Sequence, residues 1–79
     1  MIELLVFSSN SCTPCKKLKA LLNKNLIDFT EIDVDIEPEL TYTYNISALP
    51  TLVLVKDGEI LKKEVGLISK AALDEFLKV

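Results

Sequence analysis

The chain has 79 residues, two cysteines, no histidine and a formal net charge of −3. This length fits one domain over residues 1–79 with a small core, and the mildly acidic charge gives no reason to expect nucleic acid or an anionic membrane as a partner. No apolar run reaches the roughly 18 residues of a membrane-spanning helix, so we expect a soluble globular domain without membrane contact.

The first predicted element is a strand over Ile2–Phe7, a short apolar run of residues that favour strands. A run that is apolar throughout is expected to be buried on both faces, as in a central parallel strand. No basic segment precedes it and no cleavage site follows it, which indicates a strand of the mature protein and not a secretory signal. We therefore expect a cytoplasmic protein, and a reducing compartment disfavours a structural disulfide.

A helix is predicted from Thr13 to about Asn25, after the polar cluster that ends the first strand. Its apolar positions recur at three- and four-residue spacing, and its lysines lie mostly on the other side. The apolar positions are Cys15, Leu18, Leu21 and Leu22, and the lysines are Lys16, Lys17, Lys19 and Lys24. Pro14 suits the first helical turn, where no hydrogen bond is lost.

A second strand is predicted over residues 27–35, although its alternation of apolar and polar residues slips near Glu31. A short helix is expected to begin near Pro38, because proline is favoured in the first helical turn. The third predicted strand, residues 51–55, is apolar on both faces.

Asp57-Gly58 is a hairpin signal between that strand and a fourth one, because both turn positions need a positive φ. The fourth strand, residues 60–65, is rich in lysine, as is typical of a sheet edge. Gly66 ends it, and Ser69 is the expected N-cap of a last helix. The inner side of that helix is predicted to carry Ala72, Leu73, Phe76 and Leu77. The resulting order, β-α-β-α-β-β-α, is an α/β fold whose first two strands pair in parallel through a right-handed crossover and whose last two form a hairpin.

Both cysteines lie in the segment Cys12-Thr13-Pro14-Cys15, where the loop after the first strand becomes a helix. With Cys12 near the N-cap, its sulfur faces backbone N–H groups that have no partner inside the helix, and these groups favour a thiolate. Cys15 lies one turn along on the same side, close enough to close a disulfide. This geometry predicts an exposed, activated Cys12 and a more buried resolving Cys15.

Three other roles of the cysteine pair are weighed against a reactive dithiol. A zinc site usually needs four Cys or His ligands, so a metal or cluster would require a dimer that shares two cysteine pairs. A structural disulfide in so small a loop would constrain little of the unfolded chain. The absence of histidine excludes a Cys-His nucleophile pair. A CxxC segment between a buried strand and a helix is a strong signal of a redox dithiol, and we expect neither a metal nor a cofactor.

Pro50 immediately precedes the third predicted strand, in the segment "SALPTLVLV". A proline at the first residue of a strand is tolerated, because its missing N–H need not pair. The alternative is a cis Leu49–Pro50 bond, but only about one X–Pro bond in twenty is cis. Composition alone favours the trans form.

Several segments of the chain form one pattern: the first strand, the "CTPCKK" helix, "DVDIEPEL", "YNISALPTLVLVKDGEIL", "VG" and the final helix. Over nearly the whole chain, this pattern resembles the thioredoxin/glutaredoxin superfamily. The resemblance implies a thioredoxin-like fold, a four-stranded mixed sheet with helices on both faces. It also implies dithiol–disulfide exchange in which Cys12 attacks and Cys15 resolves. A cis Leu49–Pro50 bond, packed against the CxxC segment, would place its backbone beside an extended substrate. The substrate-binding residues expected on this basis are Thr13, Pro14, Leu49, Pro50 and Gly66.

The chain departs from the thioredoxin pattern at three places. The usual tryptophan before the first cysteine is Ser11, the usual Gly-Pro between the cysteines is Thr13-Pro14, and a buried aspartate of the first strand is replaced by Val6. That aspartate is thought to help shuttle the proton of the resolving cysteine. We therefore expect a pH dependence governed mainly by Cys12, and a gain in stability, because an unpaired buried carboxylate is costly and valine is not.

The chain has the length of a glutaredoxin but lacks two of its typical sequences. The Thr-Val-Pro and Gly-Gly segments that help glutaredoxins bind glutathione read Ala48-Leu49-Pro50 and Val65-Gly66-Leu67 here. We expect a small monomeric thiol–disulfide oxidoreductase that reduces protein disulfides and is recharged by a flavoprotein disulfide reductase. A glutathione-dependent reductase, a non-catalytic binding module and a metal-bridged dimer remain alternatives.

Overall fold

The computed structural model describes residues 1–78 of the chain. Its elements, in order, are β1 (Ile2–Ser8), α1 (Thr13–Lys24), β2 (Thr30–Asp33), α2 (Pro38–Thr43), β3 (Thr51–Lys56), β4 (Glu59–Val65) and α3 (Lys70–Phe76). This is the predicted order of strands and helices, and it confirms the α/β class. Over the part of the chain that is described, no helix combines the length and apolar character needed to cross a membrane.

The four strands form one mixed sheet in the order β2-β1-β3-β4. β1 pairs in parallel with β2 and antiparallel with β3, and β3 pairs antiparallel with β4. The apolar strand β1 is therefore central, and the lysine-rich strand β4 lies at an edge, as predicted. Asp57 and Gly58 form the turn of the β3–β4 hairpin with φ values of 51° and 86°, which confirms the hairpin signal.

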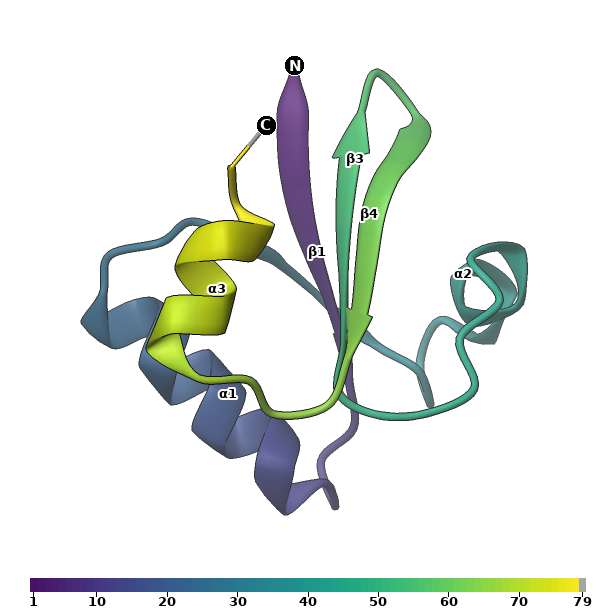
Figure 1. Ribbon diagram of the computed structural model, residues 1–79. Helices are drawn as coiled ribbons and strands as arrows, with labels where there is room; N and C mark the ends of the chain where they lie inside the picture. The colour runs from purple at the N-terminus through teal and green to yellow at the C-terminus, as the bar shows by residue number, and fades with distance from the viewer. Residues whose placement is uncertain (79) are drawn as a thin grey trace.

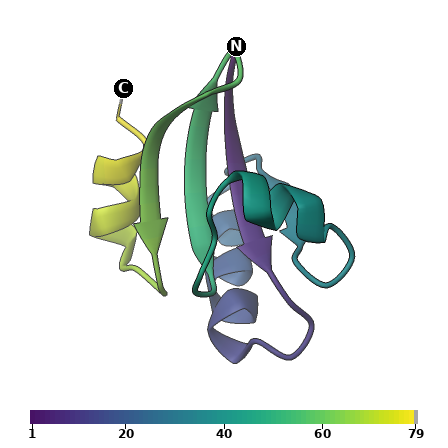
Figure 2. The same cartoon turned by 90° about the vertical axis from the view of Figure 1, so that its right-hand side faces the viewer.

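Helices cover both faces of the sheet: α1 and α3 lie on one face and α2 lies on the other (Figures 1 and 2). Between the sheet and the α1/α3 layer lies a core of Leu4, Val6, Leu18, Leu22, Leu52, Leu54, Leu73 and Phe76. On the α2 side the core consists of Leu5, Phe7, Ile32, Val53 and Val55. Successive residues of β1 and β3 thus enter different cores, because side chains alternate between the faces of a strand.

Strand β2 is shorter than the predicted span of residues 27–35. Leu26 has a φ of 55°, and the Ile27 N–H still donates to the Leu22 carbonyl at 3.0 Å, so the chain completes the end of α1 before it extends. After β2, the Asp33 carboxylate accepts a hydrogen bond from the Asp35 N–H at 2.9 Å, which closes a turn of the Asx type. Local hydrogen bonds at both ends therefore take backbone groups that a longer strand would use.

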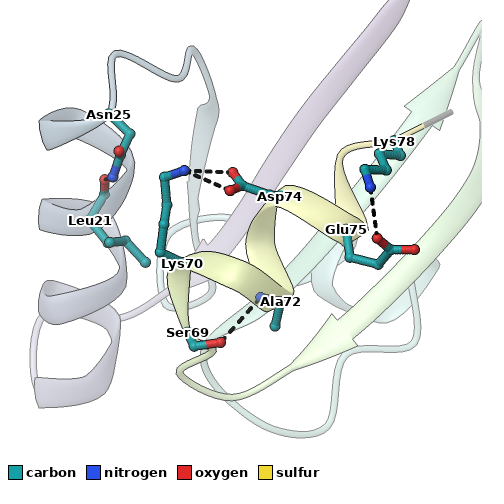
Figure 3. A network of polar contacts seen from close by, with 8 residues as sticks. All are labelled: Leu21, Asn25, Ser69, Lys70, Ala72, Asp74, Glu75 and Lys78. Atoms are coloured by element: carbon teal, nitrogen blue, oxygen red, sulfur yellow. Dashed lines mark hydrogen bonds and ion pairs between the residues drawn. The ribbon is translucent and has the colours of Figure 1, made fainter.

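The last helix begins at the predicted cap. Ser69 Oγ accepts a hydrogen bond from the Ala72 N–H at 3.1 Å (Figure 3). Leu73 and Phe76 are buried and Leu77 is half-buried, as predicted, but Ala72 is exposed, so its predicted place on the inner side is wrong. Residues at spacings of three and four share a helical face, whereas Ala72 precedes Leu73 by only one position and points about 100° away.

Two neighbouring lysines of the edge strand β4 hold the ends of helices on opposite faces of the sheet. Lys62 Nζ donates to the carbonyls of Phe76, at 3.2 Å, and Lys78 at the end of α3. Lys63 Nζ donates to the carbonyls of Tyr44, at 2.9 Å, and Asn45, at 2.8 Å, just after α2. These carbonyls lie at or just beyond the helix ends, where no following helical N–H is left to pair with them. Each lysine therefore bonds one helix end to the sheet.

Candidate active site

The predicted site segments all leave the sheet at the same end. Phe7 near the end of β1 pairs with Thr51 at the start of β3, and Thr51 pairs with Val65 at the end of β4. The loop that carries the cysteines follows β1, Pro50 precedes β3, and Gly66 follows β4. All three therefore lie next to neighbouring positions at one end of the sheet. Figures 1 and 2 show these loops together at the lower end of the molecule.

Cys12 is the N-cap of α1. Its backbone is extended, with φ −92° and ψ 105°, and its Sγ accepts a hydrogen bond from the Cys15 N–H at 3.2 Å. The first turn of α1 carries no acidic side chain. A thiolate of Cys12 would therefore receive a backbone N–H and the positive end of the helix without a competing carboxylate in that turn.

Cys12 and Cys15 form a disulfide with their Cα atoms 5.2 Å apart. Cys12 is half-buried, whereas Cys15 is fully buried under the helix. Thr13 and Pro14, the residues between them, are exposed on the first turn of α1. The two sulfurs therefore differ in access: a large substrate can approach Cys12 and not Cys15.

The peptide bond between Leu49 and Pro50 is cis, as the resemblance implied and the base rate did not. Pro50 is fully buried and Leu49 is half-buried. The Gly66 N–H donates to the Pro50 carbonyl at 2.8 Å, and Gly66 has a φ of 97°, which favours glycine. Two of the predicted substrate-binding residues, far apart in the sequence, are thus in direct contact.

Val6 lies beneath α1, where the thioredoxin pattern has a buried carboxylate. It is fully buried and packs in one core with Leu18 and Leu22 of that helix. The predicted burial of Val6 is confirmed. This position provides no group that can accept a proton.

A polar network next to this position was not among the predicted site residues. Glu31 Oε2 accepts hydrogen bonds from Ser8 Oγ at 3.0 Å and from Lys19 Nζ at 2.5 Å. Ser8 is fully buried, whereas about half of the Glu31 side chain, 45%, is exposed. The hydrogen bond from the Lys19 ammonium lowers the pKa of the Glu31 carboxyl below its usual value. Partial burial opposes this effect, and the Ser8 hydroxyl adds a further lowering.

Two sequence signals could have found this network. Lys19 was expected on the polar side of α1, but it follows Cys15 by four residues and therefore lies on the same side one turn later; its side chain is 22% exposed. The slip of alternation near Glu31 marked a polar residue at an inward-facing position, since Glu31 is the register partner of Val6.

Clusters of three or more His, Cys, Asp or Glu side chains that could together hold a metal ion do not occur within residues 1–78. The cysteine pair can carry reaction chemistry by itself. A dithiol that closes into a disulfide exchanges two electrons with another thiol–disulfide pair.

Comparisons with known proteins agree with this reading of the site. The thioredoxin family model matches residues 2–79. The chain is 35% identical over 77 residues to the thioredoxin of Mycoplasmoides gallisepticum (strain R(low / passage 15 / clone 2)), which covers 91% of this chain and 77% of that protein. It is 37% identical over 65 residues to thioredoxin H2 of Arabidopsis thaliana, which covers 76% of this chain and 49% of that protein.

Among solved structures, the oxidised form of mitochondrial thioredoxin 3 from Saccharomyces cerevisiae matches with a TM-score of 0.82 and 29% identity, covering 95% of this chain and 76% of that chain. The thioredoxin-like fold and the Cys12–Cys15 pair define a small thiol–disulfide oxidoreductase. The chain belongs to the thioredoxin family. Its substrates are, accordingly, proteins that contain disulfides.

Proposed function

We propose that Cys12 is the attacking thiolate and Cys15 the resolving thiol in the reduction of protein disulfides. One observation carries this assignment: the Cys12 sulfur caps α1 and accepts the Cys15 N–H at 3.2 Å, while Cys15 itself is fully buried. The first sulfur is reachable and held where negative charge is favoured, and the second can be reached only from within the protein.

The reaction proceeds in two exchanges. The Cys12 thiolate attacks one substrate sulfur, forms a mixed disulfide and releases the other substrate sulfur as a thiolate, which takes a proton from water. Cys15 then loses its proton and attacks Cys12 Sγ. The Cys12–Cys15 disulfide forms, the bond to the substrate breaks, and the second substrate thiolate leaves. The substrate disulfide gains two electrons and the cysteine pair loses two.

The proposed substrate-binding residues are Thr13, Pro14, Leu49, Pro50 and Gly66, of which Pro50 is buried and the other four reach the surface. The support for this is their common position at one end of the sheet and the 2.8 Å hydrogen bond between Gly66 and Pro50. A surface whose backbone is already fixed loses little freedom when an extended substrate binds.

The proposed electron donor is a flavoprotein disulfide reductase, because Ala48-Leu49-Pro50 and Val65-Gly66-Leu67 replace the sequences that help glutaredoxins bind glutathione. The protein is proposed to work in the cytoplasm, where a reducing environment keeps the dithiol ready to donate. A monomer is sufficient, since one chain supplies both cysteines. Coupling insulin reduction to such a reductase, and separately to glutathione with glutathione reductase, tests the donor: faster turnover with glutathione would contradict it.

The roles of the two cysteines are tested by replacing each with serine. Cys12→Ser should abolish turnover, whereas Cys15→Ser should accumulate a mixed disulfide with the substrate, visible as a mass increase under non-reducing conditions. In the reduced wild-type protein, an alkylating reagent at mildly acidic pH should label Cys12 much faster than Cys15, because thiolate fraction and access both favour it. Equal labelling rates, or a mixed disulfide trapped by Cys12→Ser instead, would refute the assignment.

A further inference from the structure

Three polar side chains from three elements meet on the face of the sheet that α1 covers. Ser8 ends β1, Lys19 comes from the middle of α1, and Glu31 comes from β2. The Glu31 carboxylate joins them through the bonds of 3.0 Å and 2.5 Å described above. Ser8 is fully buried and most of the Lys19 side chain is covered, whereas 45% of the Glu31 side chain is exposed. The protein therefore shields this ion pair from water only in part, because water reaches it from the Glu31 side.

Lys19, which joins the network to α1, lies one helical turn beyond the buried Cys15. Lys19 follows Cys15 by four residues and lies on the same side of α1. Glu31 is the register partner of Val6, whose side chain packs under α1. A positive and a negative charge, bonded to each other, therefore sit next to the helix turn that holds the Cys15 thiol.

The other charges around this thiol are exposed to solvent or already paired. On this face β1 and β3 contribute the uncharged residues Leu4, Val6, Ser8, Leu52 and Leu54. Helix α3 carries Lys70 and Asp74, bonded to each other at 2.7 Å (Figure 3). The remaining charges on α1 and β4 are mostly exposed, and the two lysines of β4 bond to the ends of α3 and α2. These charged residues are Lys16, Lys17, Lys24, Glu59, Lys62, Lys63 and Glu64.

We propose that Lys19 and Glu31 are positioning residues that set the acidity of the Cys15 thiol through opposing charges. Lys19 favours the Cys15 thiolate, and Glu31 cancels much of that effect. The rate at which Cys15 attacks the mixed disulfide then depends on the balance of the two. This inference rests on the proposed role of Cys15 as the resolving thiol.

The two charges predict opposite effects when each is removed. Glu31→Gln leaves the positive charge of Lys19 alone and lowers the pKa of Cys15, whereas Lys19→Met leaves the negative charge of Glu31 alone and raises it. A pKa lower by one gives about tenfold more thiolate, and the accompanying loss of nucleophilicity, roughly threefold, leaves a net gain of about threefold in rate. We therefore expect the resolving step to be about threefold faster in Glu31→Gln and about threefold slower in Lys19→Met near neutral pH.

A merely structural role of the ion pair predicts something different. Both substitutions break the same ion pair, so both would disturb the site in the same direction. Glu75→Gln is a matched control, because it makes the same chemical change in the exposed Lys78–Glu75 pair of α3 (Figure 3), 3.1 Å in length, and should leave the resolving step unchanged.

The resolving step is measured by stopped flow. Reduced protein is mixed with one equivalent of an aromatic disulfide whose free thiol absorbs visible light; the first release of that thiol reports attack by Cys12, and the second reports attack by Cys15. The pH midpoint of the second release should move down in Glu31→Gln and up in Lys19→Met. Movement in the same direction for both variants, or in neither, would overturn the proposal.

A second measurement separates this proposal from the assignment of catalytic roles. In a Cys12→Ser background Cys15 is the one remaining thiol, and its titration is followed by the ultraviolet absorbance of the thiolate. Opposite shifts of this titration in Glu31→Gln and Lys19→Met support the electrostatic inference even if Cys15→Ser fails to trap a mixed disulfide. Equal or absent shifts overturn it even if Cys15→Ser traps one.

Discussion

At the scale of single residues, the proton of the resolving cysteine finds no ionisable group at position 6 to receive it. Val6 occupies the place of a buried carboxylate and is fully buried in the α1-side core. The nearby carboxyl group of Glu31 has a lowered pKa because of Lys19, so it is already ionised and is a weak base at neutral pH. The proton of Cys15 is therefore expected to leave to water or to the substrate.

Val6→Asp should destabilise the fold and add a titration to the pH–rate profile. A carboxyl group here would enter an apolar core beside Glu31, whose carboxylate already takes the hydrogen bonds of Lys19 and Ser8. Its burial should cost at least about 2 kcal/mol of unfolding free energy. Its pKa should be raised by burial, which adds a second step to the profile. The measurements are urea unfolding and the pH dependence of disulfide reduction.

Val6→Asn is the matched control for this substitution. It has the same shape and polarity but no ionisable group, so it should lose stability without a new titration. A wild-type profile that already requires a carboxyl group of raised pKa, or a Val6→Asp variant as stable as wild type, would count against this account.

At the scale of elements, the edge strand β4 does more than end the sheet. Lysines on an edge strand discourage pairing with other chains, and here Lys62 and Lys63 also bond to the ends of α3 and α2. Helix α2 depends on this bond more than α3 does, because α2 has no fully buried residue whereas α3 buries Leu73 and Phe76.

Lys63→Met should loosen the end of α2 and lower stability by about 1 kcal/mol, since it removes charge-assisted hydrogen bonds to two helix-end carbonyls while keeping the apolar stem. Hydrogen exchange should speed up at the amides of Tyr44, Asn45 and Ile46, which close the last turn of α2. Lys56→Met, an equivalent change at the exposed end of β3, should have little effect. Unchanged exchange in this segment would show that Lys63 does not hold the helix.

The elements also show what a sequence can and cannot reveal. Apolar runs, Asp57-Gly58 and Ser69 predicted the strands, the hairpin and the last helix, because these signals depend on local backbone preferences. The lengths of β2 and the partners of Lys19 and Lys63 were not predictable in this way. The length of β2 depends on local backbone hydrogen bonds at its two ends, which the apolar pattern does not reveal. The partners of the two lysines depend on which distant carbonyl or carboxylate the folded chain brings within reach of a long side chain.

At the scale of the whole molecule, a small sheet supports two separate cores. The central strands β1 and β3 contribute alternate residues to both, so each core depends on the same pair of strands. A domain of this size has a modest stability, of order 5–10 kcal/mol. A single bond between a helix and the sheet, such as the one from Lys19 on α1 to Glu31 on β2, can therefore change the unfolding free energy of the whole domain.

The contribution of Glu31 should make the stability of the protein fall in acid. The pKa of Glu31 in the folded chain lies below its ordinary value of 4.5, chiefly because of Lys19. As the pH falls below 4.5, the unfolded chain takes up a proton first, so the stabilisation present above this pH is lost as the pH approaches the folded-state pKa. Glu31→Gln should flatten this acid limb.

Urea unfolding at a series of pH values tests this expectation. The slope of unfolding free energy against pH, below the ordinary glutamate pKa of 4.5, should be smaller in Glu31→Gln and in Lys19→Met than in wild type. Glu75→Gln serves again as the control with the same chemical change at another ion pair. An identical acid limb in wild type and Glu31→Gln would remove Glu31 from the account of acid stability.

The cap at the start of α1 links the stability of the fold to its oxidation state. Cys12 Sγ accepts the Cys15 N–H, and a thiolate is a stronger acceptor than a disulfide sulfur, so this bond contributes more to the folded protein after reduction. Folding and reduction form a thermodynamic cycle. The folding free energy differs between the oxidised and reduced forms, and the reduction potential of the cysteine pair differs between the folded and unfolded chain. The first difference equals the second multiplied by the charge transferred. A neighbouring group that strengthens the hydrogen bond to the Cys12 thiolate stabilises the reduced, folded protein. It must therefore raise the reduction potential of the folded protein, which becomes a weaker reductant by the free energy that this stabilisation contributes.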